Sequence, residues 1–316
     1  MADVTTIPRG WNAINIPDQT GKKFIITGGT SGLGKETARE LIRKGAQVTI
    51  TARDERKGEA TVVELGKERV SFSILDLTSL KSVRAFATSV TQDFDVLILN
   101  AGIMATPLKT TEDGFELQLG TNHLGHFALA GLLKNRVQER IVSVASQAHR
   151  FGNFGDGSRE TIRDRALAKG EYKPWGAYGA SKLANLLFTN ELQRRAIKND
   201  WKFSAYAAHP GWSATNLQNV SPQMRGASLE SRVTGGMNSL FAQSSSRGAL
   251  PTLCAATYPD LVGASYIGPD GLMEMRGFPK LTRGTSLAYD QLLAANLWSK
   301  SRSMRWRCPD KRQADR

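Results

Sequence analysis

Residues 23–34 of the chain read KFIITGGTSGLG, and this stretch decides the fold. Residues 23–27 form a short apolar run, which is typical of a buried strand. A glycine-rich turn occupies residues 27–34, and the sequence KETARELIRKGA then predicts a helix that ends at Gly45. A second strand is predicted at 47–51. The order strand, glycine turn, helix and strand predicts a right-handed parallel crossover.

The same alternation continues along the chain. Further strands are predicted at 70–75, 96–99, 140–145, 203–209 and 263–267, and helices within 54–65, at 79–89, 115–133 and 286–298, and from residue 178 onward. This pattern predicts one α/β domain of the Rossmann type, in which a doubly wound parallel sheet of about seven strands carries helices on both faces.

The predicted domain covers residues 22–299, after an N-terminal extension at 1–21 and before a basic, disordered tail at 300–316. Two long segments, 149–175 and 216–247, leave the carboxyl ends of predicted strands. Ligands bind at that side of an open α/β sheet, so both segments are expected to act as substrate lids.

Composition restricts the function classes. The net charge is +13, from 42 Lys+Arg against 29 Asp+Glu, and it suits an anionic small ligand, a nucleic acid or an anionic membrane. No apolar run approaches the ~18 residues of a membrane span, so no membrane anchor is expected. The two cysteines, Cys254 and Cys308, are far apart in the sequence. They argue against a disulfide framework or a metal cluster and favour a reducing cytoplasm.

The glycine turn suggests a phosphate-binding site. Its spacing is T-G-x-x-x-G-x-G, in which Gly28 and Gly32 allow close backbone approach to a phosphate. Thr30, Ser31 and Leu33 complete the turn, and the helix that follows directs its N-terminus at the anion. A purely structural turn has the same composition, but its place after the first strand of a crossover favours a nucleotide.

The end of the second predicted strand indicates which nucleotide binds. An NAD site normally has Asp or Glu there to hold the ribose hydroxyls, whereas this chain has Arg53. A guanidinium suits a 2′-phosphate through its charge and its fork of donors. The sequence therefore predicts NADP(H) in preference to NAD(H).

Tyr178 and Lys182 form a candidate pair for proton transfer. They begin the helical sequence YGASKLANLLFTNELQRRAI and, four residues apart, lie on one helix face. Free tyrosine titrates near ~10, too high for an effective acid or base at neutral pH. A neighbouring lysine cation would favour the phenolate, so Lys182 is expected to lower the pKa of Tyr178.

Seven motifs taken together resemble the short-chain dehydrogenase/reductase superfamily over roughly residues 20–298. In chain order they are TGGTSGLG at 27–34, Asp76-Leu77, Asn100-Ala101-Gly102, Asn122, Ser146, Tyr178 with Lys182, and Pro210-Gly211. The stretches KETARELIRKGAQVTITARDERKGE and YGASKLANLLFTNEL are similar to the branch of the retinol dehydrogenases and the WW-domain oxidoreductase.

The resemblance implies a catalytic tetrad. Ser146 would donate a hydrogen bond to the substrate carbonyl oxygen, and Tyr178 would exchange a proton with that oxygen. Lys182 would lower the tyrosine pKa and bond the nicotinamide ribose. Asn122 would hold a water that links Lys182 to solvent, and a buried asparagine bonded to backbone is the structural alternative.

The resemblance also implies the remaining cofactor contacts. Asp76 would contact the adenine amino group beside Leu77. Other contacts would come from Asn100, Ala101 and Gly102 behind the adenosine ribose, and from Pro210, Gly211 and Thr215 at the nicotinamide end.

Further polar and aromatic residues are candidates for the substrate pocket or the core. Met104, Gln147, Trp175 and Trp212 follow strand ends or flank Tyr178, so they are candidates for lining a substrate pocket. His123 and His126 are three apart, but other ligands of suitable spacing are lacking, so packing is favoured over a metal. His209 ends a strand and is interpreted as structural.

The leading hypothesis is an NADP-dependent oxidoreductase that interconverts a carbonyl and an alcohol, the substrate being small and apolar. Reduction of a carbon–carbon double bond, as in the related protochlorophyllide reductases, is an alternative. A non-catalytic NADP sensor or scaffold is a third reading, and the complete tetrad argues against it. Nucleic-acid binding has only the basic charge in its favour. Leu186, Leu187 and Phe188 exceed what one core face needs, which predicts a homodimer or homotetramer.

Overall fold

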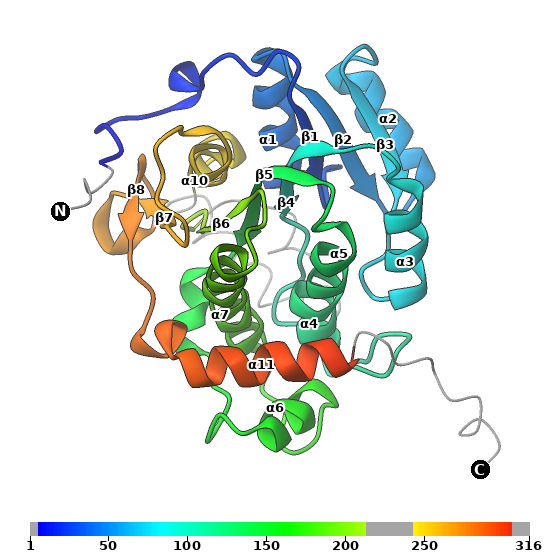
Figure 1. The fold of residues 1–316 in the computed structure, drawn as a ribbon, viewed down its shortest axis with the longest axis vertical. Coiled ribbons are helices and arrows are strands. Elements are labelled where there is room, and N and C mark those ends of the chain that lie inside the picture. Colours follow the sequence, from blue (N-terminus) through cyan, green and yellow to red (C-terminus); the bar gives the residue numbers. More distant parts are fainter. Residues whose placement is uncertain (1–5, 213–242, 305–316) are drawn as a thin grey trace, which may run out of the picture.

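The computed structural model describes residues 6–212 and 243–304 of the chain. Within these residues eight strands form one sheet in the order β3-β2-β1-β4-β5-β6-β7-β8 (Figure 1). Their bounds are β1 Lys23–Ile26, β2 Gln47–Ala52, β3 Val70–Ile74, β4 Phe94–Leu99, β5 Val137–Val144, β6 Ser204–Ala208, β7 Tyr266–Pro269 and β8 Pro279–Thr282. Neighbouring strands pair in parallel except β7 and β8, which are antiparallel. The predicted doubly wound sheet is confirmed.

The strand β1 lies inside the sheet, third in the strand order. Phe24 pairs with Val48 of β2 on one side and with Val96 of β4 on the other. Because β1 is hydrogen-bonded on both sides and covered on both faces, its side chains are almost all apolar and buried. The chain runs outward to β3 from one side of β1 and to β8 from the other. Ligands of open α/β sheets bind where the strand order reverses in this way.

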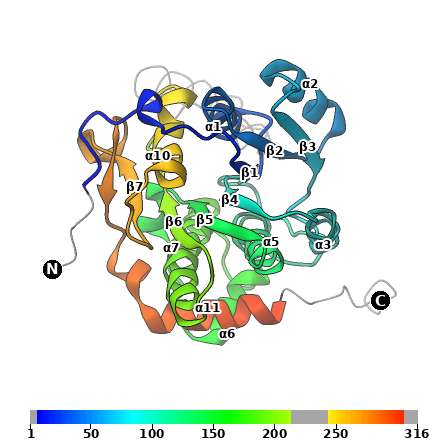
Figure 2. The ribbon, with the colours of Figure 1, turned by 45° about the horizontal axis from the view of Figure 1, so that its top comes forward.

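Helices cover both faces of the sheet, as Figure 2 shows. On one face lie α1 Gly32–Arg43, α2 Glu55–Leu65 and α10 Ser245–Thr257. On the other lie α3 Leu80–Ser89, α4 Leu117–Leu119, α5 Gly125–Leu133 and α7 Pro174–Lys198, with α6 Arg159–Ala166 and α11 Gln291–Met304 outside them. Short helical turns occur at η1 Ala13–Asn15, η2 Gly120–Leu124, η3 Gln147–Phe151, η4 Leu272–Glu274 and η5 Ser286–Tyr289. Each face of the sheet thus has its own apolar core.

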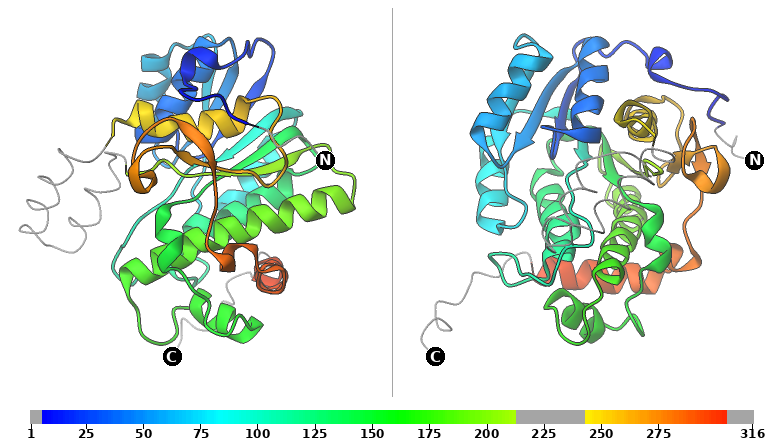
Figure 3. Two further views of the ribbon diagram at one scale, coloured as in Figure 1. Left: turned by 90° about the vertical axis from the view of Figure 1, so that its left-hand side faces the viewer. Right: turned by 180° about the vertical axis from the view of Figure 1, so that it is seen from behind.

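The helix α11 lies across the outer side of α7 (Figures 1 and 3). Leu186, Leu187 and Phe188 are buried, and the Phe188 ring stacks on Trp298 of α11 with centroids 6.0 Å apart. The apolar surface that suggested an oligomer is therefore covered by the chain itself. This helix also continues to Met304, past the boundary expected at residue 299.

Several elements differ from the sequence-based expectation. The sheet has eight strands rather than about seven, because the short β8 begins with a proline and lacks an alternating pattern. The helix α10 begins inside the expected lid at 216–247. It contains Gly248 and Pro251, two residues of low helix propensity, which is why no helix was predicted there. The helix forms nevertheless because its apolar side packs on α1. Residues 216–242 of that lid lie outside the described residues.

Two helices near the site also differ in their bounds. The helix α7 begins at Pro174 rather than Tyr178, and proline is favoured in the first turn because its missing N–H has no helical partner there. The predicted helix at 115–133 is interrupted by the π-helical turn η2, which contains Asn122. Such turns inside α-helices are frequent at functional sites. The segment 149–175, expected as a loop, contains α6 and part of η3.

Candidate active site

One cavity of about 830 Å³ opens at the carboxyl ends of the parallel strands. It gathers nearly all the residues singled out from the sequence. Those that line it are Gly28, Thr30, Ser31, Gly32, Leu33, Arg53, Asp76, Leu77, Asn100, Ala101, Gly102, Met104, Ser146, Gln147, Trp175, Tyr178, Lys182, Pro210, Gly211 and Trp212. Asn122 lies behind the wall, and Thr215 lies outside the described residues.

The glycine turn forms one end of the cavity. Gly28 has φ +68°, a left-handed conformation that glycine tolerates best, and a Cβ at Gly34 would come within 2.5 Å of the Asn100 amide nitrogen. Asn100 Nδ2 donates to the carbonyls of Thr27 (2.8 Å) and Gly28 (3.2 Å) and so holds the turn against β4. Within the described chain, no side-chain bond from Ser31 caps α1. The first-turn N–H groups of α1 therefore suit an anion.

Thr27 connects this turn to the helix that carries Asn122. His126 Nδ1 lies 3.1 Å from the Asn122 carbonyl and donates to it, so Nε2 is the accepting nitrogen. The Thr27 hydroxyl then donates to His126 Nε2 at 2.8 Å and accepts from the backbone N–H of Asn100 and of Ala101. Burial lowers the pKa of His126 to about 4, which keeps the ring neutral. These hydrogen bonds give His126 a structural role in joining the two segments.

Arg53 and Asp76 complete the same end of the cavity. Arg53 follows β2 and is exposed at the cavity wall. Asp76 follows β3, and its Oδ1 accepts hydrogen bonds from the backbone and hydroxyl of Thr78, both at 2.8 Å. The glycine turn thus shares the cavity wall with one cationic and one carboxylate side chain.

Ser146, Tyr178 and Lys182 meet in the middle of the cavity. Ser146 follows β5, and its hydroxyl is hydrogen-bonded to the Tyr178 phenol. Lys182 Nζ donates to the Val144 carbonyl at 3.0 Å and lies 5.7 Å from the centre of the Tyr178 ring. The predicted sharing of one face by Tyr178 and Lys182 is therefore observed.

The prediction that Lys182 lowers the pKa of Tyr178 is wrong for the protein side chains alone. Burial raises the pKa of Tyr178 to about 12, and the hydrogen bond with Ser146 only partly opposes this. Burial also lowers the pKa of Lys182 to about 8, so its ammonium loses a proton more readily than that of a free lysine. Removal from water is the main cause of both pKa shifts, because charged forms are disfavoured in a buried site.

Asn122 makes hydrogen bonds that join two segments beside Lys182. Its Oδ1 accepts from the Ile103 N–H at 2.8 Å, and its Nδ2 donates to the Ile103 carbonyl and to Ser181 Oγ, both at 2.9 Å. A Cβ added to Gly102 would lie 3.2 Å from Asn122 Oδ1 and 3.5 Å from Lys182 Nζ. The asparagine side chain thus joins the segment after β4 to α7, which is the structural task considered from the sequence.

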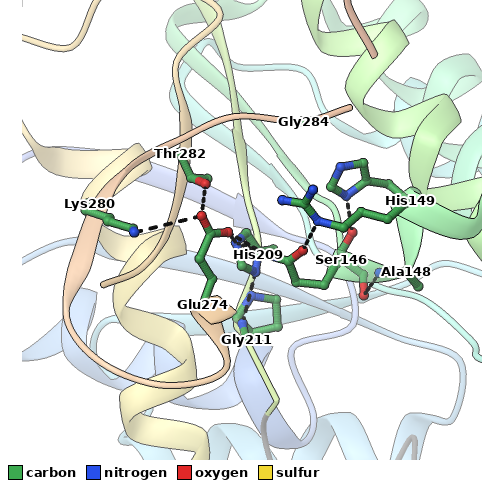
Figure 4. A network of polar contacts seen from close by, with 12 residues as sticks. Ser146, Ala148, His149, His209, Gly211, Glu274, Lys280, Thr282 and Gly284 are labelled. Carbon is green, nitrogen blue, oxygen red and sulfur yellow. Dashed lines mark hydrogen bonds and ion pairs between the residues drawn. The ribbon is translucent and has the colours of Figure 1, made fainter. Parts of the chain in front are cut away.

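The opposite end of the cavity contains a polar network that the sequence did not suggest (Figure 4). Glu274 of η4 lines the cavity and accepts hydrogen bonds from Gln147 Nε2, His209 Nε2 (3.0 Å) and the Thr282 hydroxyl. Lys280 Nζ lies 3.9 Å from its Oε1. Burial alone would raise the pKa of Glu274, but the hydrogen bonds from His209 and Thr282 lower this pKa to about 2.

His209 has a defined tautomer in this network. The Gly211 N–H donates to His209 Nδ1 at 3.2 Å, so the proton is on Nε2 and is donated to Glu274. Burial lowers the pKa of His209, so a neutral imidazole faces a carboxylate. The structural role expected for His209 agrees with this.

The segment that carries Glu274 has a strained backbone. Met273 has φ +51° and Glu274 has φ +56°, a left-handed conformation that costs about 1–3 kcal/mol for each non-glycine residue. Met273 and Met275 line the cavity on either side of Glu274. The residues follow the end of β7, so the rule that ligands bind beyond the carboxyl ends of strands would have found them once β7 was placed.

His123 packs in the core, away from the cavity lining. Its ring is buried beside Phe127 and Phe188, and its Nε2 is 3.0 Å from Ser301 Oγ. Burial lowers the pKa of His123 to about 3. Among the described residues, His, Cys, Asp and Glu side chains nowhere gather in a set of three that would hold a metal ion.

Comparisons with known proteins agree with this geometry. Residues 22–157 match the family described as short chain dehydrogenase. Human retinol dehydrogenase 13 is 36% identical over 294 residues, covering 89% of this chain and 83% of that protein. A probable oxidoreductase from Streptomyces lividans is 44% identical over 209 residues, covering 64% and 67%. The crystal structure of an uncharacterised protein from Mycobacterium paratuberculosis, 42% identical, superposes with a TM-score of 0.78 and covers 94% of this chain and 97% of that one.

The chain belongs to the short-chain dehydrogenase/reductase superfamily and, within it, to the retinol dehydrogenase-like branch. It is therefore an oxidoreductase of a family that binds a nicotinamide cofactor. The residues present fit such a group, because a Cβ at the turn glycines would collide with neighbouring atoms and, in the part of the chain that the structure describes, no Ser31 side-chain bond caps α1. None of the described helices combines the length and the apolar composition that a bilayer span requires.

Proposed function

We propose that the protein is an NADP-dependent oxidoreductase that transfers a hydride between the nicotinamide and a carbonyl or alcohol substrate, with Tyr178 as the general acid/base. The observation that carries this proposal is one cavity in which the glycine turn, Ser146, Tyr178 and Lys182 all take part in the wall. The names of relatives, retinol dehydrogenase and probable oxidoreductase, support the same chemistry.

Each residue has a part in the proposed reduction. The bound dinucleotide would supply the hydride to the carbonyl carbon. The Ser146 hydroxyl would donate a hydrogen bond to the carbonyl oxygen, and Tyr178 would transfer its phenolic proton to that oxygen to complete the alcohol. The Tyr178 phenol carries its proton at neutral pH, but its raised pKa makes it a weaker acid than free tyrosine. Lys182 would return a proton to Tyr178 and bond the cofactor ribose, and Asn122 would hold the water that links Lys182 to solvent.

The glycine-turn end of the cavity would bind the cofactor. The first turn of α1 would face the phosphates, and Asp76 would contact the adenine beside Leu77. Arg53 would pair with a 2′-phosphate, which is the basis for preferring NADP(H) to NAD(H). Pro210, Gly211 and Thr215 would hold the nicotinamide end.

The other end would bind the substrate. Met104, Trp175 and Trp212 give the wall an apolar character and favour a substrate with an apolar body. A reducing cytoplasm is the proposed location, on the basis of the cysteine usage and of Cys254, a buried free thiol.

A substrate screen tests this function. Aldehydes, ketones and secondary alcohols are assayed by the absorbance of NADPH, with the wild type, Ser146→Ala and the exposed control Ser303→Ala. We expect turnover by the wild type and by Ser303→Ala, and a loss of about a hundredfold or more in Ser146→Ala, as for removal of one oxyanion donor. Binding of NADPH without turnover of any compound would contradict the proposal.

A further inference from the structure

Arg150 is a cation in the cavity wall whose role the proposed reaction leaves open. It lies on η3, four residues after Ser146, and is exposed to solvent. Its Nε donates to Gln147 Oε1 at 2.6 Å. Among the described residues, its two terminal nitrogens have no hydrogen-bond or ion-pair partner.

The guanidinium is oriented from behind by a chain of hydrogen bonds. Gln147 Oε1 accepts from Arg150, which leaves the Gln147 amide group to donate to Glu274. Glu274 is fixed in turn by His209, which follows β6, and by Thr282 of β8 (Figure 4). The arginine Nε edge is therefore directed toward the protein, and the opposite edge with both terminal nitrogens is free for a ligand.

The strained backbone indicates that this arrangement is maintained at a cost. Met273 and Glu274 both adopt left-handed conformations, which persist only where the surroundings enforce them. The bonds of the Glu274 carboxylate supply that enforcement. Gln147, the partner of Arg150, is itself fixed by Glu274. A surface arginine without a function would not need such a fixed partner, so the network indicates a defined position for the guanidinium.

The groups around Arg150 define the ligand further. Phe151, Trp175 and Met273 line the same cavity and are strongly exposed, at 73%, 45% and 78%. They offer apolar contact in the cavity that Arg150 and Tyr178 share, and the Trp175 ring lies 6.0 Å from the Tyr178 ring. A planar carboxylate matches the two terminal nitrogens of a guanidinium, which bind it in a bidentate manner.

We propose that Arg150 is a specificity-determining residue that binds the carboxylate of the substrate, and that Gln147 and Glu274 position it. The substrate is then an oxo acid: a carbonyl at Ser146 and Tyr178, an apolar spacer along Phe151 and Trp175, and a carboxylate at Arg150. This inference deepens the proposed function and rests on it, because the carbonyl is assigned to Tyr178.

A paired substrate series tests the assignment. Linear ω-oxo carboxylates of graded chain length are compared with their methyl esters, and kcat/KM is measured with NADPH. We expect the wild type to prefer the acid at the best length. In Arg150→Met the acid-to-ester ratio of kcat/KM should fall by about tenfold or more, the size of a charge-assisted hydrogen bond. The control Arg302→Met, an exposed arginine on α11, should keep the wild-type ratio.

The positioning role of Gln147 is tested by a double-variant comparison. Gln147→Leu should lower the acid-to-ester ratio less than Arg150→Met does, and adding it to Arg150→Met should lower the ratio no further. Independent, additive effects would show that Gln147 does not act through Arg150. An acid-to-ester ratio that is unchanged in Arg150→Met would overturn the proposal.

Binding without turnover separates this inference from the proposed function. Unreactive linear fatty carboxylates and their methyl esters are titrated in the presence of NADP⁺, with tryptophan fluorescence as the signal, since Trp175 and Trp212 line the cavity. Carboxylate binding that is lost in Arg150→Met supports the subsite even if no aldehyde is turned over. Equal binding of acid and ester by the wild type, despite turnover of aldehydes, would reject the subsite and leave the reductase function standing.

Discussion

The two ends of the cavity are built in different ways. At the glycine-turn end, residues 28–34 are contiguous and present mainly backbone, with Arg53 and Asp76 added from the next two strand ends. At the Glu274 end, the polar contacts join side chains that are far apart in sequence, such as Gln147 and Glu274, separated by 127 positions. The first end depends on local backbone geometry and the second on long-range side-chain contacts. The first can therefore be found in the sequence, whereas the second becomes visible only in the folded protein.

Tyr178 lies between the two ends, and its removal should have the largest effect. Tyr178→Phe removes the proton donor, so kcat should fall by about 10²–10⁴-fold, the usual contribution of a general acid. The Kd for NADPH, measured by fluorescence titration, should stay close to that of the wild type because the glycine turn is unaltered. Tyr258→Phe, at the end of α10, is the matched control and should keep its activity. Substantial turnover by Tyr178→Phe would show that another group donates the proton.

Arg53 is the exception to the backbone character of the glycine-turn end. Arg53→Asp should lower the ratio of kcat/KM for NADPH to that for NADH by about tenfold to a hundredfold, since a charge-assisted contact to the 2′-phosphate is replaced by repulsion. Steady-state kinetics with both cofactors measure this ratio. The control Arg56→Asp makes the same change of charge on the exposed side of α2. Similar ratios in the two variants would assign the effect to net charge rather than to a specific contact.

Glu274 should show that the other end depends on side chains for its stability. Glu274→Gln replaces the acceptor of the Gln147 and His209 hydrogen bonds, so the free energy of unfolding should fall by about 1–3 kcal/mol. Urea unfolding measures the change. Glu171→Gln alters a side chain that is 78% exposed and should change stability by less than about 0.5 kcal/mol. If the two variants were equally stable, the network would not hold η4 in place.

The last prediction concerns the pH dependence of stability that the buried Lys182 produces. Burial lowers its pKa from 10.5 to about 8, so between these values the unfolded chain binds more protons than the folded one. The free energy of unfolding should therefore rise with pH in this window, by at most about 1.4 kcal/mol per pH unit. Below about pH 8 the buried ammonium destabilises the fold by its full amount. Tyr178, with its pKa raised from 10.0 to about 12, acts in the opposite sense, but only above about pH 10.

Urea unfolding between about pH 8 and about pH 10 measures this contribution. Lys182→Met should remove the rise, whereas Lys198→Met, at the exposed end of the same helix, should keep it. Parallel pH profiles for the wild type and Lys182→Met would mean that the buried ammonium is not destabilised.

The sequence predicted the sheet well because its signals are local. The apolar run at 23–27 and the glycine turn located the strand β1 and the start of α1, and the same alternation located most other strands. Prediction failed where tertiary packing overrides local preference. Pro251 lies inside a helix because α10 is buried against α1, and β8 exists only because β7 offers it an edge.

The candidate site shows the same division. The sequence by itself determined the turn, the strand ends and the spacing of Tyr178 and Lys182, since each depends on neighbouring residues. Only the tertiary structure decided the protonation of that pair, because burial raises one pKa and lowers the other. It also brought Glu274 and Arg150 to the wall of the same cavity, since contacts across the sheet depend on how the strands are ordered. The spacing of neighbouring residues can be read directly from the sequence. The removal of side chains from water and the contacts between distant residues arise only when the chain is folded.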